Sequence, residues 1–230
     1  ATHDANPHSQ DEPCRQALIG VYARLAATAQ RKSGVTLPRA PHVEMPPYET
    51  PEAFAADLAT IADSLATHGA AELGEERLEP LRYAVAAFGY HLASLDLRQN
   101  ADVHEAVVGE MLERSAVVAD YAVLDEPARV ALLAAELANP RPLRSPFVDY
   151  SERARAELAI VDAAAGVHAD YGAEAIPHYV ISKCQSVSDL LEVAVLLKAA
   201  GLVRDGRSAL DIVPLFETID DLERAGRIMR

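Results

Sequence analysis

The chain of 230 residues contains two cysteines, Cys14 and Cys184, and no tryptophan. The two cysteines lie far apart and form no CxxC pair, so the sequence predicts neither a disulfide framework nor a zinc site. We expect both to be reduced, buried thiols of a cytoplasmic protein.

Positive charge is also scarce. The chain has 21 Lys and Arg residues against 35 Asp and Glu residues, which gives a net charge of -14 and a pI of about 4.9. Nucleic acids and anionic membranes attract proteins through a positive field, so neither is an expected partner. No apolar run approaches the roughly 20 residues of a membrane span. The first ten residues, ATHDANPHSQ, lack the basic and apolar regions of a signal peptide, and we expect them to be frayed.

Half of the residues are apolar, which is enough for one large domain or two small ones. Abundant alanine and few aromatic residues favour closely packed helices. Apolar residues at helical spacing, with prolines and capping residues at the expected starts, predict helices at about 13–33, 51–69, 76–88, 101–118, 125–137, 151–171, 186–200 and 219–229. Proline-rich stretches at 35–49 and 139–146 predict loops.

Three short stretches change to a period of two and predict strands, at Tyr90–Arg98, Pro177–Lys183 and Leu210–Glu217. A helix follows each, which indicates parallel strands with helical crossovers in an α/β arrangement that is mostly helical. Three strands cannot close a barrel, so we expect an open sheet or a part of something larger. We predict a helical N-terminal layer at 1–89 and three strand–helix units at 90–230. The last helix reaches RIMR without a capping glycine, and we expect an excised segment.

The strongest candidate for chemistry is Glu217, at the junction of the last strand and its helix. Thr218 and Asp221 have the spacing of a capping box, so the helix should begin at Ile219. Glu217 then lies at the carboxyl end of a strand, where α/β proteins place their sites, and could bind a divalent metal. The alternative is an exposed acidic residue favoured by the helix dipole. Asp220 and Asp221 are better explained as first-turn and capping residues.

Three basic residues lie near the other predicted strand ends. Arg98 could bind an anion through two hydrogen bonds, or could form a salt bridge to Asp96 or to a helix acid. Lys183 is more typical of a surface or barrel-rim charge. His104 could face the strand ends, although a surface histidine is the commoner case. No paired-histidine motif, GxGxxG, P-loop or GxSxG motif is present, so the sequence supports neither a histidine metal site, nucleotide binding nor a serine nucleophile.

Three ordered motifs resemble the central region of bacterial phosphoenolpyruvate carboxylase. They are FGYHLASLDLRQN at 88–100, PHYVISKCQSVSDLLEVAVLLKAAGL at 177–202 and DIVPLFETIDDLERAGRIM at 211–229. Their order and spacing match that family, and the stretch EPCRQALIGVYARLAAT resembles it more weakly. The resemblance therefore covers nearly the whole chain.

The resemblance implies a largely helical enzyme built around a (β/α)8 barrel, of which this chain holds an incomplete part. Members of that family join bicarbonate to phosphoenolpyruvate, giving oxaloacetate and phosphate, with Mg²⁺ or Mn²⁺; carboxyphosphate and a pyruvate enolate are intermediates. Glu217 in LFET matches the family's metal-ligand glutamate. Arg98 in LDLRQ matches an arginine that contacts the substrate phosphate. A cytoplasmic homotetramer with an anaplerotic role is also implied.

The chain departs from the family pattern in two ways. Lys183 and Cys184 replace the last two residues of ISMA, and Ala101 replaces the serine of RQ[EN]S, so no role is carried over to these positions. The motifs TAHPTE, YSDSxKD and HGRGGSxGRGG are missing from the 230 residues; in the family they hold the second metal ligand, the catalytic histidines and further arginines. We therefore expect a catalytically incomplete segment that binds no metal tightly.

Two other functions stay open at this point. One is a non-catalytic helical interaction or regulatory protein derived from the enzyme. The other is a different barrel enzyme that uses a strand-end glutamate and arginine to bind another phosphorylated acid. The gene sequence beyond Arg230 would separate the three hypotheses, because only the carboxylase requires the two downstream motifs.

Overall fold

The computed structural model of the chain describes residues 11–230, and the end that we expected to be frayed, residues 1–10, lies outside them. The chain divides into two compact units, the first ending at Ala93 and the second beginning at Ser94. No helix within the described residues is long and apolar enough to cross a membrane.

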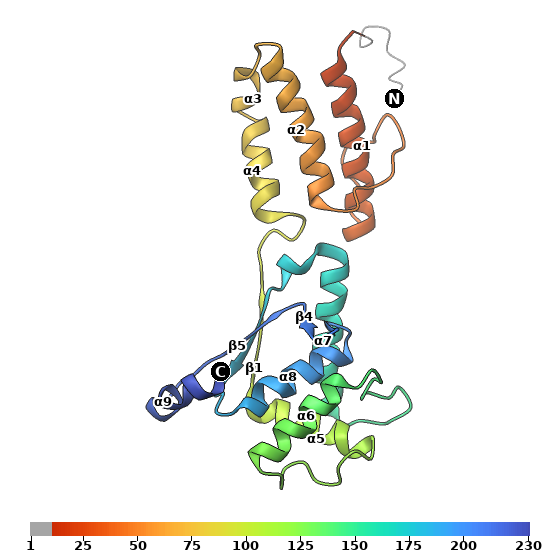
Figure 1. The fold of residues 1–230 in the computed structure, drawn as a ribbon. Helices are drawn as coiled ribbons and strands as arrows, with labels where there is room; N and C mark the ends of the chain where they lie inside the picture. The colour runs from red at the N-terminus through yellow and green to blue at the C-terminus, as the bar shows by residue number, and fades with distance from the viewer. Residues whose placement is uncertain (1–10) are drawn as a thin grey trace. The chain divides into compact units, whose positions relative to one another are not determined.

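The first unit is helical and consists of α1 (Pro13–Ser33), α2 (Pro51–Thr67), α3 (Glu72–Glu75) and α4 (Leu78–Phe88), with α1, α2 and α4 side by side (Figure 1). Local signals set the boundaries as predicted. Gly34 ends α1 in the left-handed region at φ 67°, and the Thr50 hydroxyl accepts a hydrogen bond from the Ala53 amide ahead of α2. The short helix α3 was not predicted.

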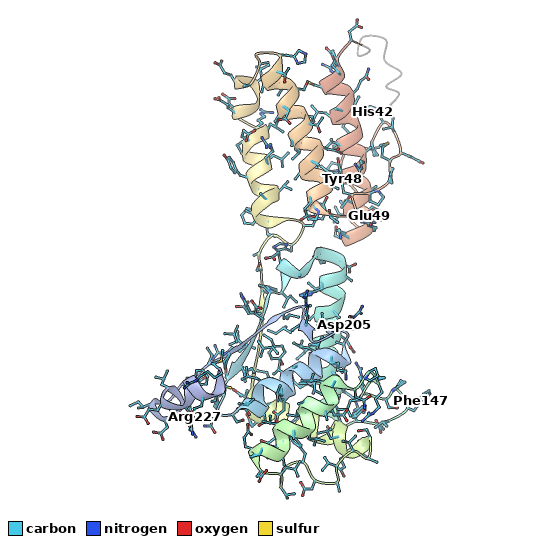
Figure 2. The ribbon with its side chains drawn as sticks, in the orientation of Figure 1. His42, Tyr48, Glu49, Phe147, Asp205 and Arg227 are labelled. Atoms are coloured by element: carbon cyan, nitrogen blue, oxygen red, sulfur yellow. The ribbon has the colours of Figure 1, made fainter. Side chains whose placement is uncertain are left out.

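The proline-rich segment 35–49 is a loop, as predicted, and its last part is anchored in the core of the first unit. Tyr48 is fully buried against Phe54, Leu58 and Val21. Figure 2 shows Tyr48 among the helices, next to Glu49 at the start of α2. Arg31 of α1 donates to the Tyr48 carbonyl and to the Glu49 carboxylate, both at 2.8 Å, so the loop is tied to α1.

The second unit is a small parallel sheet with helices, which confirms a mostly helical α/β chain. Its elements are β1 (Asp96–Asn100), α5 (Ala101–Arg114), α6 (Glu126–Ala138), α7 (Glu152–Tyr171), a 3₁₀ turn (Ala173–Ala175), β2 (His178–Ser182), α8 (Val187–Ala199), β3 (Val203–Arg204), β4 (Arg207–Ser208), β5 (Asp211–Pro214) and α9 (Ile219–Ile228). The sheet order is β1-β2-β5, with both pairs parallel, and β3 and β4 form a separate antiparallel hairpin.

Several predicted boundaries were wrong. The first strand begins at Asp96, not at Tyr90, because Gly89 and Leu92 have positive φ angles of 48° and 63° and turn the chain first. The expected loop RDGRS is the turn of the β3–β4 hairpin, where Asp205 and Gly206 both have positive φ, as a type I′ turn requires.

The ends of two other elements were also misplaced. Helix α5 stops at Arg114 instead of residue 118, because the Ser115 hydroxyl bonds back to the carbonyl of Met111 and Ala116 turns left-handed at φ 55°. The last strand ends at Pro214, three residues before Glu217. Arg98 and Glu217 therefore do not occupy the terminal strand positions that the sequence suggested.

The two faces of the β1-β2-β5 sheet differ. Tyr179 and Ile181 of β2 point into the core of the second unit, with α5, α7 and α8 packed over that side. On the other face Arg98 and Asp211 are exposed and Val180 is half-buried. Side chains on this second face are the ones that can meet a ligand at the strand ends.

Candidate functional site

Arg98 reaches the carboxyl end of the sheet from the middle of its strand. It lies opposite Val180 of β2, and the strand ends at Asn100, which lies opposite Ser182. Its Cα is thus two residues, about 7 Å, short of the end. The side chain covers that gap, since Arg98 Nε donates a 2.9 Å hydrogen bond to Ser182 Oγ.

Glu217 reaches the same place from beyond the end of β5. Backbone contacts with β2 continue past the strand, from Leu215 N to the Ile181 carbonyl at 2.8 Å and from Cys184 N to the Leu215 carbonyl at 3.2 Å. Glu217 Oε1 then accepts a long, 3.4 Å hydrogen bond from the backbone amide of Lys183. The glutamate is exposed and lies next to Lys183, the residue that directly follows β2.

The helix that follows Glu217 begins where the sequence predicted. The Thr218 hydroxyl accepts from the Asp221 amide at 3.1 Å, and the Asp221 carboxylate accepts from the Thr218 amide at 3.2 Å, so the capping box is confirmed. These hydrogen bonds with Thr218, with Arg224 nearby, lower the pKa of Asp221. Asp220 lies in the exposed first turn, which leaves Glu217 as the carboxylate that faces β2.

The structure thus brings both predicted site residues to two adjacent residues at the end of β2, its last residue Ser182 and the following residue Lys183. Arg98 contacts the first through a side chain, and Glu217 contacts the second through its backbone. Within residues 11–230 neither Arg98 nor Glu217 makes an ion pair. The alternative for Arg98, a salt bridge to Asp96, is wrong, because Asp96 Oδ1 lies 2.9 Å from His178 Nδ1 instead. An exposed guanidinium and an exposed carboxylate at one strand end are both free to bind a ligand.

Comparison with known proteins identifies the family. The family model described as "Phosphoenolpyruvate carboxylase" matches residues 1–230. The chain belongs to the phosphoenolpyruvate carboxylase family. Curated relatives of that name include one from Rhodopseudomonas palustris, 52% identical over 98% of this chain and 24% of its own length, and one from Aromatoleum aromaticum, 52% identical over 98% of this chain and 25% of its own. A third, from Burkholderia mallei, is 48% identical over the whole chain and 25% of its own length. The chain spans about a quarter of the length of these relatives.

The donor set for a metal in this carboxylase-family chain is partial. No group of three or more His, Cys, Asp or Glu residues in the described part of the chain is arranged to hold a metal ion. Glu217 supplies one exposed carboxylate, which suits Mg²⁺ or Mn²⁺ as a single oxygen ligand. Such ions usually need a second carboxylate or substrate oxygens, so Glu217 could supply one ligand and the described residues do not form a complete metal site.

A cleft of about 510 Å³ lies beside the strand ends, between the starts of α5, α6 and α8. Three of its four acidic lining residues have partners within the protein. The Glu126 carboxylate accepts from the Ser188 amide at 3.0 Å, Asp189 accepts from the Gln185 amide at 2.7 Å, and Glu105 pairs with an arginine. These three carboxylates connect the starts of the helices, and the fourth, Asp102, is exposed in the first turn of α5.

Lys183 occupies an exposed position with an unusual backbone. Its φ of 58° lies in the left-handed region, which non-glycine residues rarely adopt. Its side chain is exposed and has no ion pair within residues 11–230, which agrees with the predicted surface charge. The part of Lys183 that meets Glu217 is the backbone amide, so the difference from the family's ISMA motif leaves that contact in place.

His104 does not belong to the site, and the interpretation of it as a surface histidine is also wrong. It is fully buried on α5, and its Nε2 lies 3.0 Å from the Tyr179 hydroxyl, on the face of the sheet that the helices cover. Burial lowers the pKa of His104 to about 4, so the imidazole is neutral at physiological pH.

Neither thiol is placed for chemistry. Cys184 is buried as expected, and burial raises the pKa of its thiol to about 12. Cys14 is half-buried on α1. The residue that the sequence analysis missed is Ser182. Its only signal was its place at the end of a predicted strand next to Lys183, and nothing in the sequence indicated its contact with Arg98.

Proposed function

We propose that this chain is the central part of a phosphoenolpyruvate carboxylase, an enzyme that converts phosphoenolpyruvate and bicarbonate into oxaloacetate and phosphate. The observation that carries the proposal is that Arg98 and Glu217 contact adjacent residues, Ser182 and Lys183, at the end of β2, in a chain that belongs to this family. The alternatives, a non-catalytic interaction protein and a barrel enzyme for another phosphorylated acid, have no structural observation in their favour.

Arg98 is proposed to bind the phosphate of phosphoenolpyruvate. The guanidinium donates through Nε to Ser182, so its two terminal nitrogens can bind phosphate oxygens in the bidentate way that arginine favours. The positive charge offsets the negative charge of the phosphoryl group as it leaves the enol oxygen and is transferred to bicarbonate.

Glu217 is proposed to be one ligand of Mg²⁺ or Mn²⁺. The cation, when bound, would offset the negative charge that develops on the enolate oxygen. What this chain contributes is the position of the carboxylate, which is fixed by the Lys183 amide on one side and by the start of α9 on the other. The remaining ligands would come from outside these residues.

The three parallel strands are proposed to be consecutive strands of a (β/α)8 barrel whose other strands lie outside this chain. The face of the sheet that carries Arg98, Ser182 and Val180 would then line the barrel interior. We further propose that the intact enzyme is a cytoplasmic homotetramer with no nucleic-acid or membrane partner, in an anaplerotic role.

The test of the metal-ligand role is Glu217→Ala in the full-length protein. Loss of a carboxylate that binds a catalytic cation should lower oxaloacetate formation by at least about a hundredfold. The matched control is Glu223→Ala, which removes an exposed carboxylate from α9 and should leave turnover unchanged. Wild-type turnover of Glu217→Ala at saturating Mg²⁺ would refute the role.

The isolated 230 residues should neither form oxaloacetate nor bind Mg²⁺ tightly, because one carboxylate seldom holds a divalent ion. A coupled assay for oxaloacetate and a calorimetric titration with Mg²⁺ measure the two properties. Turnover by the isolated chain would show that the proposed division of the site is wrong.

A further inference from the structure

Ser182 is a buried polar residue at the centre of the candidate site. It is the last residue of β2, only 5% of it is exposed, and it lies between two strands whose side chains converge on the strand ends. Its hydroxyl accepts the hydrogen bond from Arg98 Nε at 2.9 Å. No other residue in the described part of the chain makes a hydrogen bond or an ion pair with the Arg98 side chain.

This contact constrains a side chain that would otherwise be mobile. Arg98 is exposed and has a long side chain with many rotamers, which it would lose entropy to order. An acceptor at Nε fixes the plane of the guanidinium without using its two terminal nitrogens. A guanidinium held in this way presents both of those nitrogens, already oriented, to an oxyanion.

The residue after Ser182 contacts the other candidate site residue, Glu217. Lys183 has a left-handed backbone at φ 58°, and its amide donates to Glu217 Oε1 at 3.4 Å. Non-glycine residues keep such a conformation only where the surroundings impose it, and these positions are frequent at functional sites. The last residue of β2 and the residue that follows it therefore contact Arg98 from β1 and Glu217 from the segment after β5.

We propose that Ser182 is a positioning residue, which orients Arg98 for the phosphate of the substrate. The inference rests on the proposed function, because it takes the anion that Arg98 binds to be the phosphate of phosphoenolpyruvate. Ser182 acts through Arg98 and does not itself need to touch the substrate.

The test uses the full-length enzyme with Ser182→Ala, Ser182→Thr and Arg98→Ala. Removing the hydroxyl should lower kcat/KM by roughly tenfold, mainly through a higher KM for phosphoenolpyruvate, because Arg98 binds the phosphate both before and during the reaction. Threonine keeps the oxygen and suits a strand, so Ser182→Thr should restore kcat/KM to within about threefold of wild type.

The double variant Ser182→Ala with Arg98→Ala separates positioning from general damage. If Ser182 acts through Arg98, the serine change should cost almost nothing more once the arginine is gone. The proposal would be overturned if the two losses of kcat/KM multiplied in the double variant. It would also be overturned if Ser182→Thr lowered kcat/KM as much as Ser182→Ala does.

Crystal structures of the full-length variants give a readout that does not depend on turnover. The Arg98 guanidinium should leave its position or become disordered in Ser182→Ala and should keep it in Ser182→Thr. An unchanged Arg98 in Ser182→Ala would refute the positioning role even in an active enzyme. A wild-type protein that forms no oxaloacetate would refute the proposed function, while the position of Arg98 would still decide whether Ser182 orients it.

Discussion

Each of the two units contains a buried tyrosine whose hydroxyl donates to a carboxylate while an arginine lies over its ring. In the first unit Tyr48 donates to Asp57 Oδ2 at 2.6 Å, and the Arg24 guanidinium carbon lies 3.8 Å from the ring centre. In the second unit Tyr121 donates to Glu192 Oε1 at 2.8 Å, and the guanidinium carbon of Arg129 lies 5.0 Å from the ring centre.

The two arginines differ in the partners of their side-chain N–H groups. Arg24 Nη1 lies 3.0 Å from the same Asp57 oxygen that accepts from Tyr48, so this carboxylate has a cationic partner. Arg129 instead pairs with Glu105 at 2.8 Å and donates to two backbone carbonyls.

Glu192 is therefore buried without a cation. It is 0% exposed, and its Oε2 has no hydrogen-bond partner in residues 11–230. Burial raises the pKa of Glu192 to about 8, only partly opposed by the Tyr121 hydrogen bond, so the group holds a proton at neutral pH. A tyrosine, an arginine and an acidic residue thus form an ion pair in the first unit, whereas in the second unit the acidic residue is buried and protonated.

The largest effect is expected from removing the tyrosine of the first unit. Tyr48→Ala should lower the free energy of unfolding of that unit by about 3–5 kcal/mol, because it leaves a cavity where a fully buried ring packs against Phe54 and under Arg24. Urea denaturation measures the change. Tyr83→Ala is the control; Tyr83 is 72% exposed on α4, and its loss should change stability by less than about 0.5 kcal/mol.

Glu192→Gln should remove a pH dependence from the stability of the second unit. The unfolded chain loses this proton near pH 4.5 and the folded chain near pH 8, so the folded state binds the extra proton between these values. The stability that protonated Glu192 contributes is complete below pH 4.5 and is lost as the pH rises to 8.

Glutamine keeps an acceptor for Tyr121 and has no proton to lose. At pH 8 the variant should be more stable than wild type by on the order of 3 kcal/mol, and near pH 5 the two should be alike. Urea denaturation at both pH values measures the difference, with the exposed Glu223→Gln as control. A constant difference across the range would show that Glu192 is ionised in the folded protein.

His104 gives the stability of the second unit a pH dependence of the opposite sign. Burial lowers the pKa of His104 to about 4, so the unfolded state binds more protons between pH 4 and 6.5 and stability falls as the pH is lowered through that range. His104→Gln can still bond the Tyr179 hydroxyl and should remove about 2 kcal/mol of this acid sensitivity. Thermal unfolding at pH 4.5 and 7 would test it; equal acid sensitivity in wild type and variant would contradict the assignment.

The features that the sequence predicted correctly depend on neighbouring residues. A capping box needs only two residues three positions apart, and both predicted boxes, Ser186 with Asp189 and Thr218 with Asp221, are present. The order of strands and helices followed from changes of period along the chain. Glu217 was singled out because a strand–helix junction is itself a local signal, and its role as a metal ligand stays a prediction.

The features that the sequence did not predict depend on residues that meet only after folding. The burial of His104 and Glu192 depends on β2, α5, α6 and α8 packing together, and both residues look like polar positions on a helix. The contact between Arg98 and Ser182 joins two strands separated by three helices, so its register could not be read from either strand alone.

The smallest predicted effect comes from removing only the two hydroxyl groups, in Tyr48→Phe and Tyr121→Phe. At pH 7 each should lower the free energy of unfolding by about 1 kcal/mol, the usual value of one hydrogen bond. Above pH 8 the cost of Tyr121→Phe should increase, because ionised Glu192 loses its only hydrogen-bond donor within the described residues. The cost of Tyr48→Phe should stay constant, because Asp57 keeps Arg24. Urea denaturation of both variants at pH 6 and pH 9 measures the two trends; parallel trends would mean that Arg129 neutralises Glu192 as fully as Arg24 neutralises Asp57.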